Sequence, residues 1–201
     1  MGTVWDERFA GEEYYYGTEP NEFVRKQSAD LPKGKALCLG EGEGRNAAWL
    51  ASHGFEVVAV DLSTVGLRKA QALANRFNAS ISTVVADLEE YVPAKGGYDL
   101  VVITFVHLPP EVRTKVHRRA LAALKPEGYL ILQCFSKDQL QFQSGGPKDS
   151  ALLVTTDDIR FDFLDGHILL LEQSEEDISE GAHHIGHCSV VSCLVQAGGD
   201  S

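Results

Sequence analysis

Short apolar runs alternate with amphipathic stretches along most of this chain. The apolar runs occupy residues 36–39, 55–60, 81–86 and 98–103, and most of them are followed by stretches in which apolar residues return every three or four positions. A nearly continuous apolar run predicts a strand covered on both faces, whereas a 3.6-residue period predicts a helix. The alternation therefore predicts an α/β fold, with a mostly parallel sheet and helices on both of its faces.

The remainder of the chain adds further elements of both kinds. The predicted ones are a short helix near 21–27, a helix over 110–124, a strand over 129–135, a helix beginning at 155–158, and strands over 167–173 and 188–195. Residues 136–150 have no regular period. Because no internal repeat or second domain is visible, we predict a single domain over residues 1–201 with seven strands.

A glycine-rich turn joins the first predicted strand to the first predicted helix. Three alternate glycines stand in Gly40-Glu41-Gly42-Glu43-Gly44, and the helix begins at Arg45. Glycine permits a positive φ angle and lets a ligand approach the backbone closely. The dinucleotide fingerprint would have its third glycine where this chain has Arg45. The turn is a candidate nucleotide-like site with a different spacing.

The second predicted strand ends in an acidic residue, Asp61, about 20 residues beyond the turn. Ligands of open α/β sheets bind at the carboxyl ends of the strands, where a carboxylate can accept hydrogen bonds from the two hydroxyls of a ribose. The turn and Asp61 are therefore expected to face the same ligand.

Residues 36–61, with this turn and this acidic residue, resemble motifs I and II of the class I S-adenosylmethionine-dependent methyltransferases. The phrase Leu124-Lys125-Pro126-Glu127-Gly128-Tyr129-Leu130 resembles the L-K-P-G-G-x-L turn of the same superfamily. One departure is Cys38, which stands where the family usually has an acidic residue. The resemblance implies S-adenosylmethionine as the cofactor and a Rossmann-like, doubly wound, seven-stranded sheet that ends in an antiparallel hairpin.

The resemblance also implies the roles of residues around the cofactor. The glycine turn would pass beneath the methionine portion, Asp61 would hold the ribose, and Asp87 with Leu88 would bound the adenine, although Asp87 also suits a helix or turn cap. Arg45 would pair with the methionine carboxylate or with an acidic substrate. The expected cofactor residues are Tyr16, Gly40, Glu41, Gly42, Arg45, Asn46, Asp61, Leu62, Ser63, Asp87, Leu88, Thr104, Phe105 and Val106.

The N-terminal segment narrows the resemblance. The opening Trp5-Asp6-Glu7-Arg8-Phe9 and the tyrosines at 14–16 are similar to the tellurite-resistance and thiopurine-methyltransferase-like group. In that group the N-terminal arm folds over the cofactor pocket, which implies the same for residues 1–34 and for Tyr16. The alternative is an arm whose aromatic side chains only cover the edge of the sheet.

Two later phrases resemble the same group. The piece Gly145-Gly146-Pro147-Lys148-Asp149 would make the loop 136–150 a substrate lid, and the alternative is a plain surface connection. The segment Glu180–Gly186 fits the phrase E-G-x-x-H-x-G of the group. This fit makes His184 a candidate for the wall of the pocket.

Two histidines, His107 and His184, are the candidate catalytic residues. His107 follows the fourth predicted strand at its carboxyl end, where it could act as a base or contact the substrate, or only bond to the backbone. The three histidines at 183, 184 and 187 suggest a metal site, but neighbouring side chains on extended backbone point in opposite directions. We therefore predict no metal.

The composition limits the partners of the protein. The chain has 201 residues and a net charge of −11, which disfavours binding to nucleic acid. It contains no run of 18 apolar residues and no apolar N-terminal signal, so we expect a cytoplasmic protein that does not bind a membrane. Its four cysteines lack C-x-x-C spacing and are expected to be reduced thiols in the core.

The sequence thus predicts an S-adenosylmethionine-dependent methyltransferase that acts as a monomer or homodimer on a small thiol, chalcogen oxyanion or amine. One alternative is a catalytically silent protein that binds S-adenosylmethionine. A nicotinamide-dependent oxidoreductase would have glycine at position 45, and a nucleic-acid methyltransferase would have an N/D-P-P-Y/F phrase after the fourth strand. The acceptor, the use of a general base, the oligomeric state and the role of the loop 136–150 are left open.

Overall fold

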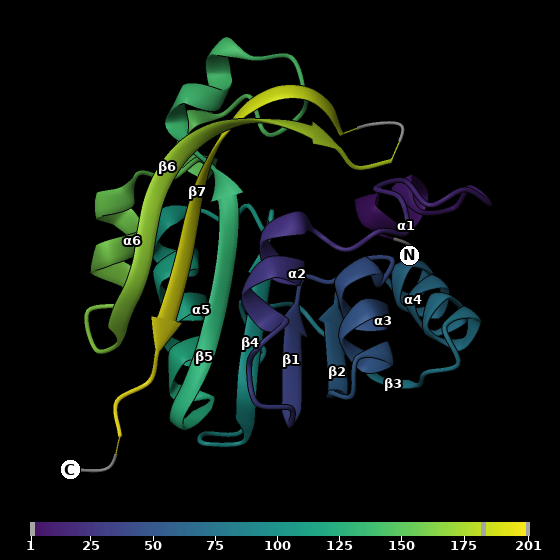
Figure 1. The fold of residues 1–201 in the computed structure, drawn as a ribbon. Coiled ribbons are helices and arrows are strands. Elements are labelled where there is room, and N and C mark those ends of the chain that lie inside the picture. The colour runs from purple at the N-terminus through teal and green to yellow at the C-terminus, as the bar shows by residue number, and fades with distance from the viewer. Residues whose placement is uncertain (1–2, 182–183, 200–201) are drawn as a thin grey trace.

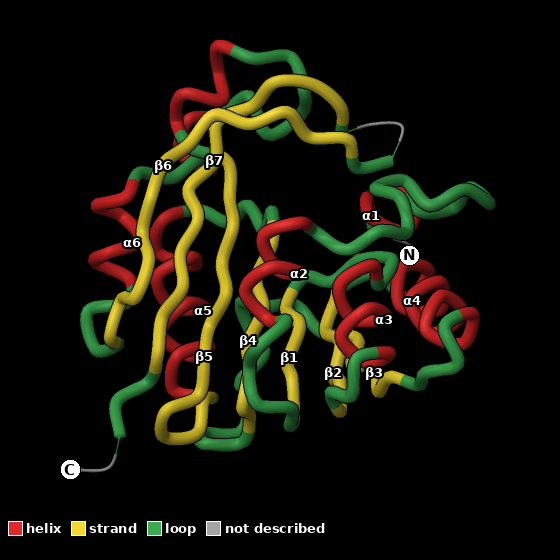
Figure 2. The backbone as a smooth tube through the Cα atoms, in the orientation of Figure 1, coloured by secondary structure: helices red, strands yellow, loops and turns green. Residues whose placement is uncertain are grey.

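A computed structural model describes residues 3–181 and 184–199 of the chain. In it, seven strands form a mixed sheet in the order β3-β2-β1-β4-β5-β7-β6, with helices on both faces (Figures 1 and 2). The strands are β1 (Lys35–Leu39), β2 (Glu56–Asp61), β3 (Ile81–Val85), β4 (Tyr98–Thr104), β5 (Leu124–Phe135), β6 (His167–Ser179) and β7 (Ile185–Gln196). The helices are α1 (Val4–Arg8), α2 (Glu22–Ser28), α3 (Arg45–Ser52), α4 (Thr64–Arg76), α5 (Pro110–Ala122) and α6 (Thr156–Asp162), with 3-10 turns η1 (Lys137–Gln141) and η2 (Ser150–Leu152). The predicted α/β class is confirmed.

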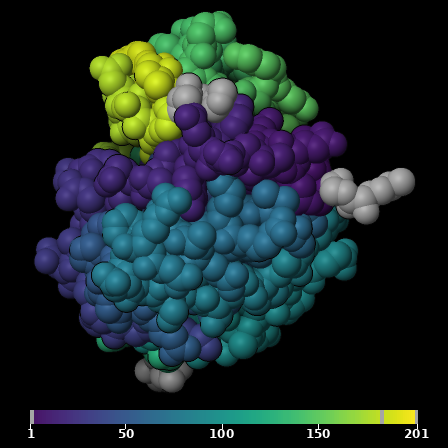
Figure 3. All heavy atoms as spheres, turned by 90° about the vertical axis from the view of Figure 1, so that its right-hand side faces the viewer, coloured from purple at the N-terminus to yellow at the C-terminus, as the bar shows by residue number. Residues whose placement is uncertain are grey.

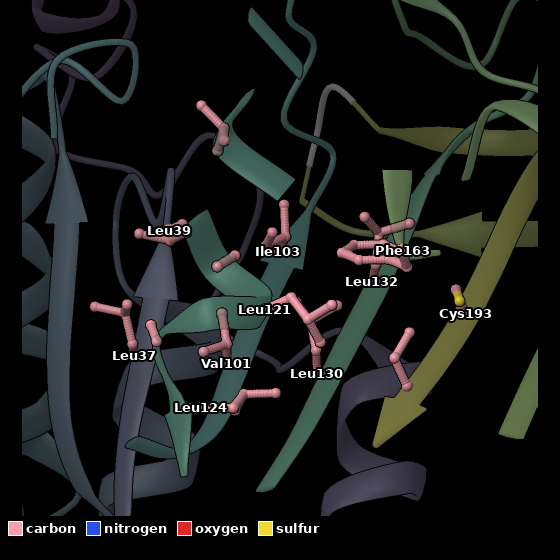
Figure 4. Packing of buried hydrophobic residues seen from close by; sticks show 14 of the residues in the cluster. Leu37, Leu39, Val101, Ile103, Leu121, Leu124, Leu130, Leu132, Phe163 and Cys193 are labelled. Carbon is pink, nitrogen blue, oxygen red and sulfur yellow. The ribbon is translucent and has the colours of Figure 1, made fainter. Parts of the chain in front are cut away.

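The central strands contribute alternate side chains to two hydrophobic clusters on opposite faces of the sheet. Leu37 of β1 and Val101 of β4 pack with residues of α5 and α6 on one face, as Figure 4 shows in part. Ala36 and Leu100, one position earlier on each strand, pack with residues of α2, α3 and α4 on the other face. Because successive side chains of a strand point to opposite faces, these apolar runs produce a doubly wound sheet.

The last two strands form the expected antiparallel pair. Strand β7 lies antiparallel between β5 and β6, while β3, β2, β1, β4 and β5 are parallel to one another. The pairing of β5 with β7 ends at Phe135 and Val190, but β6 and β7 continue to pair as far as Ser179 and Ile185. This extension of the hairpin curves over the upper edge of the sheet towards the N-terminal segment (Figure 1).

Several element boundaries differ from the predictions. Helix α1 was not predicted, because its five residues are too short for a period, although Thr3 and Asp6 form a capping box there. Helix α5 ends two residues before the predicted end at 124. Strand β5 begins at Leu124, before the predicted start at 129. The hairpin strands extend beyond 167–173 and 188–195, because the added turn-proximal part of β6 is rich in acidic and serine side chains and lacks an apolar alternation.

All four cysteines are buried free thiols, and burial raises the pKa of Cys134 and of Cys193 to about 12. They are therefore inert core residues, as predicted. Within the described part of the chain, no helix combines the length and the apolar character needed to cross a membrane.

Candidate functional site

A cavity of about 590 Å³ lies at the carboxyl ends of β1, β2, β3 and β4. Its volume falls in the range of small-molecule sites. It is bordered by every residue predicted to contact the cofactor except Ser63, and by both predicted catalytic histidines. The rule that ligands bind at strand ends thus predicted the place of this cavity.

The glycine turn between β1 and α3 forms one wall of the cavity. Gly40 and Gly44 have φ angles of 64° and 89°, in the left-handed region that favours glycine. A Cβ atom on Gly40 would collide with the side chain of Val106, and one on Gly44 would collide with Ala70 of α4. The turn therefore needs glycine both for its backbone conformation and for close packing against its neighbours.

Asp61, at the end of β2, is fixed by two backbone amides. Its Oδ2 accepts a hydrogen bond from the amide of Gly42 at 2.8 Å, and its Oδ1 accepts one from the amide of Ser63 at 2.8 Å. Burial raises the pKa of this carboxyl. Because each carboxylate oxygen can accept two hydrogen bonds, Asp61 keeps acceptor capacity for a ligand in the cavity that it borders.

Ser63 lies behind this wall. Its Oγ accepts a hydrogen bond from the amide of Gly66, which caps α4, and donates one to Asp6 of α1 at 2.7 Å. The structure thus places Ser63 as a support of Asp61 and of the N-terminal segment, outside the lining of the cavity.

Glu41 carries a carboxyl group in the glycine turn, three residues after Cys38. Its Oε1 accepts a hydrogen bond from the amide of Ala47 at 2.7 Å. Burial nevertheless raises the pKa of Glu41 to about 7, assisted by the negative charge of Asp61. At neutral pH this carboxyl is therefore balanced between its neutral and ionised forms, so a charged group in the cavity can change its ionisation.

A chain of amide side chains joins the start of α3 to the ends of β4 and β5. Asn46 donates a hydrogen bond to the hydroxyl of Thr104 at 3.0 Å and accepts one from the amide of Asn21 at 2.9 Å. The side chain of Asn21 donates in turn to Gln133 at 2.7 Å. These bonds fix the carboxyl ends of two neighbouring strands relative to the glycine turn.

Arg45 forms an ion pair with Glu180 at the tip of the hairpin. Its Nη1 lies 2.7 Å from Oε1 of Glu180 and its Nη2 donates to Oε2 at 2.8 Å. Both side chains are nearly buried, with 10% and 11% of their surface exposed. The sequence predicted a ligand carboxylate as the partner of Arg45, but the structure places a carboxylate of the protein there.

His184 borders the cavity beside this ion pair. Its Nδ1 lies 2.7 Å from Oε2 of Glu180. Three aromatic rings surround the imidazole edge to face, with centroid distances of 5.6 Å to Tyr16, 4.7 Å to Phe105 and 5.1 Å to Phe135. Phe105 has a φ angle of 52°, which is rare for a large side chain and typical of functional sites.

His107 forms another part of the wall. Its ring stacks on Phe135 at a centroid distance of 5.6 Å. Burial lowers the pKa of His107 to about 4, and among the residues that the structure describes its buried Nδ1 has no hydrogen-bond partner. The imidazole is therefore neutral at physiological pH, which makes His107 a weaker proton acceptor than its ordinary pKa implied.

The N-terminal segment lies across the cavity, between the central part of the fold and the hairpin (Figure 3). Phe9 is buried and packs over Gly42 of the turn. Glu43 accepts a hydrogen bond from the amide of Tyr15 at 2.7 Å and pairs with Lys69 of α4. The second acidic residue of the glycine turn therefore binds the segment itself.

Part of the loop 136–150 also borders the cavity, through Gly145, Gly146 and Pro147. The side chain of Gln139 holds this part by donating hydrogen bonds to Ser144 and to the carbonyl of Gly145. The lid function of the loop stays a prediction.

Several lining residues were not predicted individually. Trp5, Arg8, Phe9 and Tyr15 belong to the arm that was expected to fold over the pocket, and Gly145, Gly146 and Pro147 belong to the loop considered as a lid. Ala86, Leu108, Phe135 and Leu152 carried no site prediction. Phe135 could have been found, because it is the last residue of a parallel strand and the strand-end rule applies to it. The partner of Arg45 gave no local signal, since Glu180 lies 135 residues away.

Among residues 3–181 and 184–199, no group of histidine, cysteine and acidic side chains is arranged to hold a metal ion. His184 bonds to Glu180, whereas the exposed His187 lies 2.9 Å from Asp177 and 3.1 Å from Glu175. The third histidine of the suggested group, His183, is outside the described residues.

Comparisons with known proteins place this site in a wider context. Residues 36–128 match the protein family described as "Methyltransferase domain". No curated protein sequence matches the chain. Solved structures match nearly the whole length of this chain. Because their sequence identities are low, they show only a shared fold.

Three solved structures illustrate this likeness. One, determined for the conversion of a disulfide bond into a thioacetal group during echinomycin biosynthesis, has a TM-score of 0.75 and 18% identity, over 98% of this chain and 92% of the other. TehB from Haemophilus influenzae has a TM-score of 0.74 and 18% identity, over 96% and 67%. The N-methyltransferase NodS from Bradyrhizobium japonicum, in complex with S-adenosyl-L-homocysteine, has a TM-score of 0.73 and 13% identity, over 96% of both chains.

Proposed function

We propose that this chain, in which residues 36–128 form an S-adenosylmethionine-dependent methyltransferase domain, methylates a small molecule with a thiol, chalcogen-oxyanion or amine group. It would do so as a monomer or a homodimer. The observation that carries the proposal is the pairing of an open glycine turn with a fixed acidic residue: Asp61 is held by the amide of Gly42 and still borders the cavity.

The residues around the cavity fit this cofactor. Asp61 retains acceptor capacity for the two ribose hydroxyls. Asp87 and Leu88 border the side of the cavity expected to hold the adenine. Glu41 supplies the acidic group that Cys38 lacks, and its carboxyl can ionise beside the methionine ammonium. When bound, the cofactor supplies a methyl group made electrophilic by its sulfonium.

The remaining cavity wall suits a small acceptor. Phe105, Phe135, His107 and His184 enclose the space next to Thr104, at the end of β4. Aromatic walls exclude water and restrict the orientation of a bound molecule, and alignment of two reactants is a large part of catalysis of this kind. We assign this side to the acceptor, with His184 as the group that can take a proton.

The competing functions fit less well. A nicotinamide-dependent oxidoreductase would have glycine at position 45, whereas the Arg45 side chain is used in an ion pair with Glu180. The solved structures with the same fold differ in their reported chemistry. One is an N-methyltransferase, one was determined for the conversion of a disulfide bond into a thioacetal group, and one is TehB. We therefore keep three acceptor classes in the proposal.

Calorimetric titration with S-adenosyl-L-homocysteine, run beside NADH, tests the cofactor. We expect micromolar binding of the former, and we expect Asp61→Ala to weaken it by more than tenfold, or about 1.4 kcal/mol. Asp99→Ala is the matched control, because Asp99 bonds to Lys35 and Lys125 at the opposite end of the strands. Binding of NADH alone, or no binding at all, would contradict the proposal.

Transfer of a labelled methyl group tests whether the protein is an active enzyme. Thiol, chalcogen-oxyanion and amine acceptors should be supplied in parallel with the labelled cofactor. Transfer to one class identifies the acceptor chemistry. Tight cofactor binding without transfer to any class would favour a protein that only binds the cofactor.

A further inference from the structure

The carboxylate of Glu180 is surrounded by hydrogen-bond donors. Its Oε1 contacts Nη1 of Arg45 at 2.7 Å and accepts from the side-chain amide of Asn21 at 3.2 Å. Its Oε2 accepts from Nη2 of Arg45 at 2.8 Å and contacts Nδ1 of His184 at 2.7 Å. Three of these contacts are hydrogen bonds, and the contact with Nη1 of Arg45 is part of the ion pair. Both carboxylate oxygens of Glu180 are therefore held by partners from the protein itself.

These contacts fix the ionisation of Glu180. Burial opposes its charge, but the hydrogen bond with His184 and the neighbouring Arg45 lower the pKa of Glu180 to about 2. An ionised carboxylate only accepts hydrogen bonds. The Nδ1 atom of His184 must therefore carry the proton that lies between the two groups, which leaves Nε2 of a neutral imidazole without a proton.

The surroundings leave this Nε2 atom available to a molecule in the cavity. His184 borders the cavity, and no hydrogen bond to its Nε2 occurs within residues 3–181 and 184–199. The rings of Tyr16, Phe105 and Phe135 contact the imidazole edge to face and keep it in place. An oriented imidazole with one bonded nitrogen and one free nitrogen is the arrangement of a general base.

We infer that Glu180 and Arg45 are positioning residues, which hold His184 with its proton on Nδ1 so that Nε2 accepts a proton from the methyl acceptor. The inference rests on the proposed methyltransferase function. The acceptor atom gives its proton to Nε2 and its electron pair to the methyl carbon, whose bond to the sulfonium sulfur breaks with the electron pair remaining on sulfur. Nδ1 of the resulting imidazolium still donates its hydrogen bond to Glu180.

This arrangement selects among the three acceptor classes. An amine or a neutral thiol has a proton to lose, so an oriented base accelerates its methylation. An oxyanion is already charged and gains nothing from a base. Furthermore, Glu180 neutralises Arg45, so this guanidinium does not offer an uncompensated charge to an anion. The inference therefore places a protic nucleophile at His184.

Arg45 also connects this base to the cofactor turn. It is the first residue of α3, directly after Gly44, and it contacts the hairpin residue Glu180. Arg45 therefore links the glycine turn directly to the carboxylate that orients His184. The ion pair holds the two sides of the site in one arrangement.

Nitrogen NMR of the unliganded protein tests the inference, because long-range couplings to the ring protons distinguish the two imidazole tautomers. At a pH where His184 is neutral, we expect the wild type to have its proton on Nδ1. Glu180→Gln should produce a mixture of tautomers or the opposite one, since an amide can also donate. Glu176→Gln is the matched control, because Glu176 lies near the end of β6, four residues before Glu180, and bonds to Gln133 instead.

An Nε2-protonated imidazole in the wild type, or the same tautomer in Glu180→Gln, would overturn the inference. The second variant in this experiment changes Arg45. Arg45→Lys is chosen because Arg45→Met would remove a buried charge partner and could prevent folding. With a protic acceptor, Glu180→Gln should lower kcat by tenfold or more. It should affect the affinity for S-adenosyl-L-homocysteine much less.

The two proposals fail in different ways. If S-adenosyl-L-homocysteine does not bind while His184 has its proton on Nδ1, the proposed function fails and only the geometry stands. If it binds and methyl transfer occurs with the other tautomer, the function stands and the positioning role fails.

Discussion

Gly17 of the N-terminal segment and Gly181 of the hairpin pack backbone against backbone above the cavity. A Cβ atom on Gly181 would lie 2.5 Å from the amide nitrogen of Gly17 and 2.6 Å from the carbonyl carbon of Tyr16, and Gly181 itself has a φ angle of 66°. Two segments that are distant in sequence can therefore pack closely here because neither glycine has a side chain. This contact joins the arm to the residues next to His184.

Gly181→Ala should separate the arm from the hairpin. The new methyl group would overlap with the backbone of Gly17, and a left-handed alanine adds roughly 1–2 kcal/mol of strain. We expect about tenfold weaker binding of S-adenosyl-L-homocysteine by calorimetry and faster proteolysis of the arm. Gly11→Ala is the control, since a Cβ there meets no atom within 4 Å. Equal behaviour of the two variants would show that the contact does not close the site.

Glu41→Gln should change how stability depends on pH. The folded protein keeps the proton of Glu41 up to its pKa of about 7, while the ordinary pKa is 4.5, so the folded state binds more protons between these values. Wild-type stability therefore falls as pH rises through this window, by on the order of 3 kcal/mol. The variant should lack this loss and be the more stable protein above pH 7 in denaturant titrations.

The same carboxyl should make cofactor binding depend on pH. An ammonium group favours ionised Glu41, so binding of S-adenosyl-L-homocysteine below pH 7 should release a proton and strengthen as pH rises. Calorimetry in buffers of different ionisation enthalpy measures this proton. The release should vanish in Glu41→Gln and persist in Glu56→Gln, whose side chain is 77% exposed. Proton release unaffected by Glu41→Gln would exclude this role.

Asp162 of α6 should be a major contributor to stability. It is completely buried and accepts hydrogen bonds from Arg113 at 2.8 Å and from Thr114, and it also contacts Nδ1 of His117 at 2.8 Å. Asp162→Asn would leave the Arg113 charge poorly compensated, at a cost of about 3–5 kcal/mol in the free energy of unfolding. Chemical denaturation measures the loss. Asp157→Asn, on the same helix, is the control and should change stability by less than about 0.5 kcal/mol.

The stabilisation by Asp162 should be lost at low pH. Burial opposes ionisation of Asp162, but His117 and Arg113 lower its pKa from 3.8 to about 2. The stabilisation is therefore fully present above the ordinary pKa and is lost as pH falls towards 2. Asp162→Asn should show a weaker acid dependence than the wild type over this range. An unchanged acid transition would contradict this assignment.

Local patterns in the chain determined much of this protein. The apolar runs determined the strands of the parallel sheet, because a strand covered by helices on both faces has no polar side. The glycine turn and Asp61 followed from the same logic, since both stand where predicted strands end and such ends meet at one edge of a sheet. Cys134 and Cys193 were placed in the core by their apolar neighbours.

Only the tertiary structure decided the partners of the polar groups. The sequence predicts that Arg45 pairs with a ligand, yet in the structure it forms an ion pair with Glu180. Glu43 of the glycine turn binds the N-terminal segment and Lys69. The aromatic rings around His184 likewise come from distant parts of the chain. Hydrophobic periodicity depends on neighbours in sequence, whereas a buried charge requires a partner within a few ångströms in space. The course of the chain decides which residue that is.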